Sequence, residues 1–207
     1  MERGGLGILL AQGNEDPVQL EAAVPHLEAG LTAFPQGDHA RVVLVQSQIR
    51  LGRGEAALAN LQPLLTERAD DPRVQLMAGQ ALRLAGRLDE AEGYLRQAAT
   101  APATRVRAVL ELVETLAAGK KYREAADLLG EFMRSDGATL DGLTRLATLL
   151  VRAGDQDAAK RILDDVIARD ENFRDALILR ALLAAGEGDV EQTERLYRKA
   201  LAANPGD

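Results

Sequence analysis

The fold is decided by residues 72–102, which read PRVQLMAGQALRLAGRLDEAEGYLRQAATAP. Small residues cluster around Gly79 in the first half, and Gly86 opens a short turn that separates the two halves. The second half carries an apolar stripe at helical spacing, formed by Ala91, Leu95 and Ala98. This pattern predicts two short amphipathic helices joined by a tight turn.

Ala91 marks a register that recurs every 34 residues along the chain. The same step leads back to Ala57 and Ala23 and forward to Ala125, Ala159 and Thr193. Because one helix pair cannot bury both of its apolar stripes, such units stack on their neighbours. We therefore expect an all-α fold, a right-handed α-solenoid of six helix–turn–helix units that forms one domain over residues 1–207. The predicted units are approximately 4–37, 38–71, 72–105, 106–139, 140–173 and 174–207.

The first unit is the least regular and is expected to act as a degenerate terminal cap. Residues 6–12 predict a short helix, and residues 13–15 predict a turn that is longer than the turns of the other units. Asp16 is a suitable N-cap, with Pro17 at the first helical position after it.

Composition excludes several classes of function. Apolar residues make up 46% of the chain and aromatic residues only 3%, which suits close-packed helices built from Ala, Leu and Val. The net charge of −7 argues against a nonspecific nucleic-acid binder, and no apolar run approaches the roughly 20 residues of a membrane span. We expect no nucleic-acid partner and no membrane insertion. A cytoplasmic protein is favoured, with a periplasmic piece of a longer protein as the alternative.

No residue constellation for catalysis is evident. His26 and His39 fall on different predicted helices, the chain has no Cys, and neither Ser47 nor Ser135 lies in a nucleophile elbow. The glycine-rich residues 4–7 follow no strand, so they fail the context that a phosphate-binding loop requires. We expect no enzyme activity, no cofactor and no metal site.

The repeats resemble the tetratricopeptide repeat family. The family's small eighth position appears as Gly79, Ala147 and Ala181, and its turn appears as residues 86–91 and 154–159. Two other units depart from the family pattern because they carry valine at this eighth position. The chain also departs from it in having mostly leucines where the family usually has aromatic residues. The resemblance covers essentially the whole chain. It implies that the first helix of each unit lines a concave groove that binds other proteins.

The resemblance also implies which side chains line that groove. Carried onto this chain, the family's positions predict a protein-binding site formed by Gln46, Arg50, Arg73, Met77, Gln80, Arg83, Arg107, Leu110, Glu111, Glu114, Arg145, Thr148 and Arg152. The same positions also include His39, Val42, Val43, Ile49, Leu76, Leu84, Ala117, Ala118, Asp141, Thr144, Val151, Asp175, Ile178, Leu179, Leu182, Ala185 and Gly186. The Lys, Asn and Arg clamp that some members use for a terminal carboxylate is missing, because no ninth position is Asn.

Arginines outnumber carboxylates among these positions, although the chain as a whole is acidic. Arginine binds carboxylates through two parallel hydrogen bonds, and Met77 with its apolar neighbours could seat an aliphatic side chain. We therefore expect a protein or peptide partner with acidic and aliphatic side chains. The alternative is a ladder of internal ion pairs, for example Arg145 with Glu111.

The leading hypothesis is a non-catalytic scaffold that binds a peptide or helix of a partner in the groove. One alternative is a homodimer, formed through an apolar edge of the last unit at Leu177, Leu196 and Leu201. Another is a repeat segment of a larger enzyme or of a secretion or assembly protein.

Overall fold

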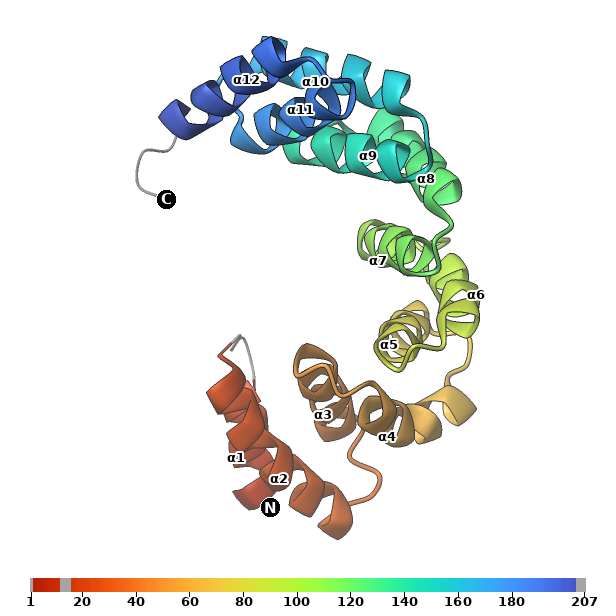
Figure 1. The fold of residues 1–207 in the computed structure, drawn as a ribbon. Helices are drawn as coiled ribbons and strands as arrows, with labels where there is room; N and C mark the ends of the chain where they lie inside the picture. The colour runs from red at the N-terminus through yellow and green to blue at the C-terminus, as the bar shows by residue number, and fades with distance from the viewer. Residues whose placement is uncertain (1, 12–15, 204–207) are drawn as a thin grey trace. The chain divides into compact units, whose positions relative to one another are not determined.

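The computed structural model describes residues 2–11 and 16–203, and all regular secondary structure in these ranges is helical (Figure 1). The helices are α1 (Glu2–Ala11), α2 (Pro17–Ala33), α3 (Asp38–Arg50), α4 (Gly54–Glu67), α5 (Pro72–Leu84), α6 (Leu88–Ala98), α7 (Arg105–Ala118), α8 (Tyr122–Asp136), α9 (Leu140–Arg152), α10 (Gln156–Arg169), α11 (Arg174–Gly186) and α12 (Val190–Ala203). The predicted all-α helical-repeat fold is confirmed.

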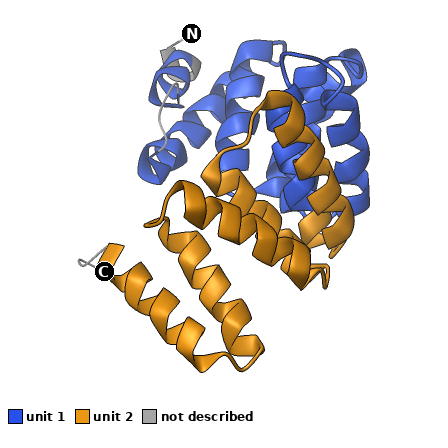
Figure 2. Cartoon of the chain, turned by 90° about the horizontal axis from the view of Figure 1, so that it is seen from above, with its two compact units in different colours: residues 1–115 blue, residues 116–207 orange. Residues whose placement is uncertain are grey.

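The chain divides into two compact units, residues 1–115 and 116–207 (Figure 2). In unit 1, each of the helices α1 to α5 packs on the next one along the chain. In addition, α3 contacts α5. In unit 2, α9 packs on α8 and α10, α11 packs on α10 and α12, and α9 contacts α11. Within each unit, the first helices of successive hairpins therefore lie beside one another.

A single turn motif recurs in every hairpin from the second onward. The second residue after the first helix of the hairpin has positive φ, at Gly52, Gly86, Lys120, Gly154 and Gly188. The next residue donates its N–H to the carbonyl five positions earlier, as Arg87 does to Leu82 at 2.9 Å. These are the features of a Schellman motif, which favours glycine because a side chain is strained at positive φ. The sequence places Gly119 in the fourth turn, but the strained position is Lys120, with φ of 61°.

The residues that mark the register lie where helices approach most closely. Ala23, Ala57, Ala91, Ala125 and Ala159 are all fully buried. Gly79 goes further, because a Cβ atom on it would lie 2.5 Å from Cγ of Leu95. The side chain at each of these points is a methyl group or a hydrogen atom. The helix backbones can therefore approach each other closely, and the leucines around them fill the core.

The N-terminal hairpin corrects one prediction and confirms another. The first helix begins at Glu2 rather than at Leu6, so the glycine-rich start is helical. There, a Cβ on Gly7 would lie 2.9 Å from the backbone nitrogen of Leu27, which shows how closely α1 and α2 pack. Asp16 caps α2 as predicted, accepting a 3.0 Å hydrogen bond from the Val18 N–H. The predicted turn at 13–15 lies outside the described residues.

The last hairpin contradicts the predicted apolar edge. Leu177 is fully buried and Leu196 is 9% exposed, because α11 and α12 pack against each other around Ala181 and Ala200. Only Leu201 of the three is exposed, at 64%. The two buried leucines are therefore core residues and are unavailable to a second copy.

The close contact at Gly79 can be tested with paired substitutions in one hairpin. We expect Gly79→Ala to destabilise the protein by about 1–2 kcal/mol, because the overpacking against Leu95 exceeds the gain in helix propensity. Gly93→Ala, in α6, should instead stabilise by about 0.5–1 kcal/mol, since nothing lies within 4 Å of its added Cβ. Urea unfolding followed by circular dichroism measures both. Equal effects of the two substitutions would contradict the packing argument.

The strained turn at Lys120 yields a second prediction. Lys120→Gly should stabilise the protein by about 0.5–1 kcal/mol, because relief of the left-handed strain exceeds the added entropy of the unfolded chain. The reciprocal control is Gly154→Lys, at a φ of +85° with no atom near the added Cβ, which should destabilise. Thermal and urea unfolding of the two variants provide the measurement. A destabilised Lys120→Gly protein would show that the lysine side chain has a compensating role.

Candidate functional site

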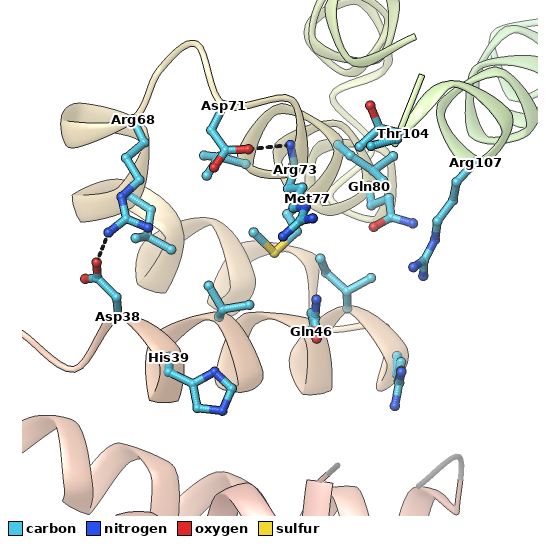
Figure 3. Close-up of a pocket in the computed structure, with 17 residues that line it drawn as sticks. Asp38, His39, Gln46, Arg68, Asp71, Arg73, Met77, Gln80, Thr104 and Arg107 are labelled. Atoms are coloured by element: carbon cyan, nitrogen blue, oxygen red, sulfur yellow. Dashed lines mark hydrogen bonds and ion pairs between the residues drawn. The ribbon is translucent and has the colours of Figure 1, made fainter. Parts of the chain in front are cut away.

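A groove of about 610 Å³ lies in unit 1 (Figure 3). We call it the unit 1 groove. It is lined by residues of α3, α4, α5 and α7 and of the segments between them: Asp38, His39, Val42, Gln46, Ile49, Arg50, Leu64, Arg68, Asp71, Arg73, Val74, Leu76, Met77, Gln80, Ala103, Thr104 and Arg107. Six of the thirteen predicted site residues belong to it, namely Gln46, Arg50, Arg73, Met77, Gln80 and Arg107.

The carboxylates at the rim of this groove are engaged within the protein. Asp71 is the N-cap of α5 and accepts a 2.8 Å hydrogen bond from the Arg73 backbone N–H, while Pro72 occupies the first helical position. Asp38 forms an ion pair with Arg68, which reaches across from the end of α4 (Figure 3). Four arginines and these two aspartates line the groove, so its net charge is positive.

Arg73 and Arg107 supply that charge. Both are exposed, and neither side chain makes a hydrogen bond or ion pair with any residue in the described part of the chain. Figure 3 shows them extending from α5 and α7 at the groove. His39 and Arg50 also line the groove, but each already interacts within the protein. Arg73 and Arg107 are thus the cations best placed to bind an acidic ligand.

The apolar part of the groove is more deeply buried than the sequence suggests. Met77 is only 6% exposed and belongs to the core of unit 1 together with Val74. Val42 and Ile49 are partly buried and pack against the same core. Met77 therefore forms part of a firm apolar floor, and a ligand would contact its edge rather than its whole side chain.

Gln80, Arg83 and Glu111 form a small polar network between α5 and α7. The Gln80 amide donates to Oε1 of Glu111 at 2.7 Å, and Nε of Arg83 donates to Oε2 at 3.1 Å. Gln80 is only 5% exposed, and the Arg83 and Glu111 side chains are 29% and 21% exposed. The anticipated alternative of internal ion pairs therefore holds for Arg83, which binds Glu111 and does not line the groove.

A second groove, of about 490 Å³, lies between α9 and α11 in unit 2, and we call it the unit 2 groove. Its lining consists of Asp141, Thr144, Arg145, Thr148, Asp175, Ile178, Leu179 and Leu182. Every one of these residues occupies a groove position implied by the family resemblance. Two of them, Arg145 and Thr148, belong to the predicted site.

The remaining predicted residues line neither groove. Leu110 is 36% exposed on α7, and Glu114 is exposed but already interacts within the protein. Arg152 lies over the ring of Tyr122, with its guanidinium carbon 5.7 Å from the ring centroid. This cation–π contact gives Arg152 a role within unit 2.

Sequence reasoning missed the groove residues that lie outside the first helices. Arg68 follows α4, Asp71 precedes α5, and Ala103 and Thr104 precede α7. The Asp-Pro pair at 71–72 is the sequence signal that could have identified Asp71 as the cap of α5. The repeat pattern contains no signal that the segments between repeats line the groove.

Titratable groups with displaced pKa values lie away from both grooves. A hydrogen bond from the Ala158 backbone N–H, followed by one from Arg123, lowers the pKa of Asp155. The hydrogen bond from Lys160 to Glu187 raises the pKa of Lys160. Asp155 caps α10 and binds Arg123, and Lys160 of α10 binds Glu187, which follows α11. These charged groups therefore contribute to the packing of the helices in unit 2.

The side chains considered for catalysis have structural surroundings. The Ser47 hydroxyl is buried and donates to the Val43 carbonyl at 2.8 Å, and Ser135 donates to the Phe132 carbonyl at 3.0 Å. Within the described ranges, no group of three or more His, Cys, Asp or Glu residues could hold a metal ion. Nor does any described helix have the length and apolar character needed to cross a membrane.

Stacked helical hairpins with side chains of the first helices lining open grooves define a helical-repeat protein. Sequence profiles of the tetratricopeptide repeat match residues 9–81 and residues 144–207. The chain belongs to the tetratricopeptide repeat family.

Curated relatives include subunit 7 of the anaphase-promoting complex. The mouse and human proteins are 32% and 31% identical to this chain over 128 residues, which is 61% of the chain and 23% of each relative. The chain thus matches about a quarter of the length of those proteins.

Solved structures share the fold at low sequence identity. PilW, a type IV pilus biogenesis factor, has a TM-score of 0.76 and 19% identity, with 100% of this chain and 96% of PilW covered. A tetratricopeptide repeat protein from Parabacteroides merdae has a TM-score of 0.75 and 15% identity, with 98% and 80% covered. YrrB has a TM-score of 0.64 and 16% identity, with 87% and 93% covered.

The polar network at Glu111 can be tested by its stability contribution. Glu111→Ala should destabilise the protein by about 1–3 kcal/mol, because the buried Gln80 amide loses its acceptor and Arg83 loses its ion pair. Glu111→Gln should cost less, since one acceptor oxygen remains. As a control, Glu90→Ala breaks the exposed pair with Arg87 and should leave the urea midpoint nearly unchanged. Equal shifts for Glu111→Ala and Glu90→Ala would exclude a structural role for the network.

Proposed function

We propose that this protein is a non-catalytic scaffold and that its unit 1 groove binds a segment of a partner protein with acidic and aliphatic side chains. The observation that carries the proposal is the pair of exposed arginines, Arg73 and Arg107, beside an apolar floor. Neither guanidinium is neutralised by any described residue. Arg83, Glu111 and Arg152, which lie outside the grooves, have structural roles in this proposal.

The chemistry of the groove favours a peptide segment over a small ionic ligand. A guanidinium binds a carboxylate with two parallel hydrogen bonds, which fixes both position and orientation. Burial of aliphatic side chains on the floor formed by Val42, Ile49 and Met77 would add a favourable hydrophobic contribution. A segment that presents both kinds of side chain therefore uses the groove most fully.

The comparisons support protein binding as the general role. The solved structure of YrrB is described as having an unusual peptide-binding site, and PilW is described as a pilus biogenesis factor. The curated relatives are subunits of the anaphase-promoting complex. We further propose that the six predicted repeats form one solenoid and that the chain works as part of a larger assembly.

A peptide selection tests the unit 1 groove directly. Random dodecapeptides displayed on phage and selected on the wild-type protein should include a class that combines Asp or Glu with Leu, Ile or Val. For a synthetic peptide of this class, Arg73→Glu with Arg107→Glu should raise the Kd by about tenfold or more, because two attractive charges become repulsive. Fluorescence anisotropy measures the Kd, and circular dichroism confirms the helical content of the variant.

The matched control changes net charge equally at sites outside both grooves. Arg161 and Arg195 are exposed on α10 and α12, and Arg161→Glu with Arg195→Glu should leave the Kd unchanged. If both double variants weaken binding equally, the effect is general electrostatics and the groove assignment is wrong. Selection of no acidic–aliphatic class on the wild type would reject the proposed ligand.

Self-association is a second candidate, favoured by exposed apolar side chains of the last hairpin. Val190 is 76% exposed and Leu201 is 64% exposed, both on α12, and Leu182 on α11 is 54% exposed. Sedimentation velocity over a range of concentrations distinguishes the two candidates, because a monomer at every concentration excludes the homodimer.

A further inference from the structure

The unit 2 groove carries the opposite charge to the unit 1 groove at the same repeat position. Arg73 and Arg107 are 34 residues apart, and two further steps of 34 lead to Asp141 and Asp175. Both aspartates line the unit 2 groove. The position that supplies an exposed arginine on α5 and α7 thus supplies a carboxylate on α9 and α11.

The two carboxylates are available to a ligand. Asp141 and Asp175 are exposed, and neither makes a hydrogen bond or ion pair through its side chain with any residue that the structure describes. Arg145, which lines the same groove, already interacts within the protein. Each aspartate lies in the first turn of its helix, where the helix dipole favours negative charge. That interaction is with the helix end and leaves carboxylate oxygens accessible from the groove.

Apolar surface accompanies the carboxylates. Leu182 is 54% exposed, and Ile178 and Leu179 are partly exposed beside it. The hydroxyl groups of Thr144 and Thr148 donate to carbonyls of their own helix at 2.9 and 3.0 Å. These threonines therefore keep their donors within α9, and the groove offers a ligand apolar contacts and carboxylate acceptors.

We infer that the unit 2 groove binds an aliphatic side chain flanked by Lys or Arg in a segment of a partner protein. The aliphatic group covers Ile178, Leu179 and Leu182, and the flanking cations pair with Asp141 and Asp175. Lys and Arg also suit an apolar groove, because their methylene stems pack on it while the charged group reaches the carboxylate. An acidic segment would meet two like charges there. This inference concerns a different groove from the proposed function and does not depend on it.

A selection with random dodecapeptides on phage tests the inference. On the wild-type protein, we expect a class in which Lys or Arg adjoins Leu, Ile or Val. The substitutions Asp141→Arg and Asp175→Arg together give this repeat position the charge in unit 2 that it has in unit 1. The double variant should lose the basic class, and the Kd of a representative synthetic peptide should rise by about tenfold or more.

Two further variants separate the ligand effect from effects on folding and net charge. Glu55 and Glu191 are exposed acidic residues in the first turns of α4 and α12, and neither lines a groove. Glu55→Arg with Glu191→Arg should therefore leave the Kd unchanged. Asp141→Asn with Asp175→Asn removes the charges with little change in shape. It should weaken basic peptides severalfold while circular dichroism shows the helical content of the wild type.

The two grooves can fail independently in this design. Basic peptides should be insensitive to Arg73→Glu with Arg107→Glu, whereas acidic peptides should be lost there. Loss of the acidic class alone would reject the proposed function and leave this inference standing. The inference is overturned if the wild type selects no basic–aliphatic class, or if both unit 2 double variants bind such peptides as tightly as the wild type.

Discussion

The close approach of neighbouring helix backbones is the constraint on which the rest of the structure depends. It occurs wherever a residue of the 34-residue register is Ala or Gly, as at the fully buried Ala91 and at Gly79 against Leu95. A larger side chain at such a point would separate the helices and open gaps among the leucines around them. Because the contact repeats within each unit, first helices such as α3 and α5, or α9 and α11, lie beside one another. The grooves follow from that regularity.

Repetition separates the positions that stabilise the stack from those that can recognise a ligand. The turn at Lys120 keeps its hydrogen bonds and its left-handed backbone although glycine is replaced, because the surrounding motif repeats unchanged. The positions of Arg73 and Asp141 carry no such restriction, since these two side chains are exposed. Arg73 and Asp141 can therefore occupy equivalent places with opposite charge. A repeat protein can vary its ligand chemistry from one hairpin to the next without altering its core.

The period and the small residues were sufficient to predict the helical hairpins, because backbone geometry depends on local sequence at these points. The family pattern also predicted every residue of the unit 2 groove, together with others, such as Val151 and Arg152, that do not line it. It did less well where a side chain has a competing partner. Gln80 and Arg83 are bound to Glu111, and Leu177 is covered by α12 rather than left at an edge. Such choices depend on distances between helices, which the repeat pattern does not contain.

The sequence by itself determined the class of fold, the hairpin register and the positions of α9 and α11 that line the unit 2 groove. It did so because a 34-residue period of small and apolar residues allows few other ways to bury the apolar stripes. Only the tertiary structure decided which charged side chains are available. Asp38 is paired with Arg68, and Asp71 caps a helix, whereas Arg73 and Arg107 have no such partner among the described residues. That distinction is made by the segments between repeats, whose paths place their side chains at the groove.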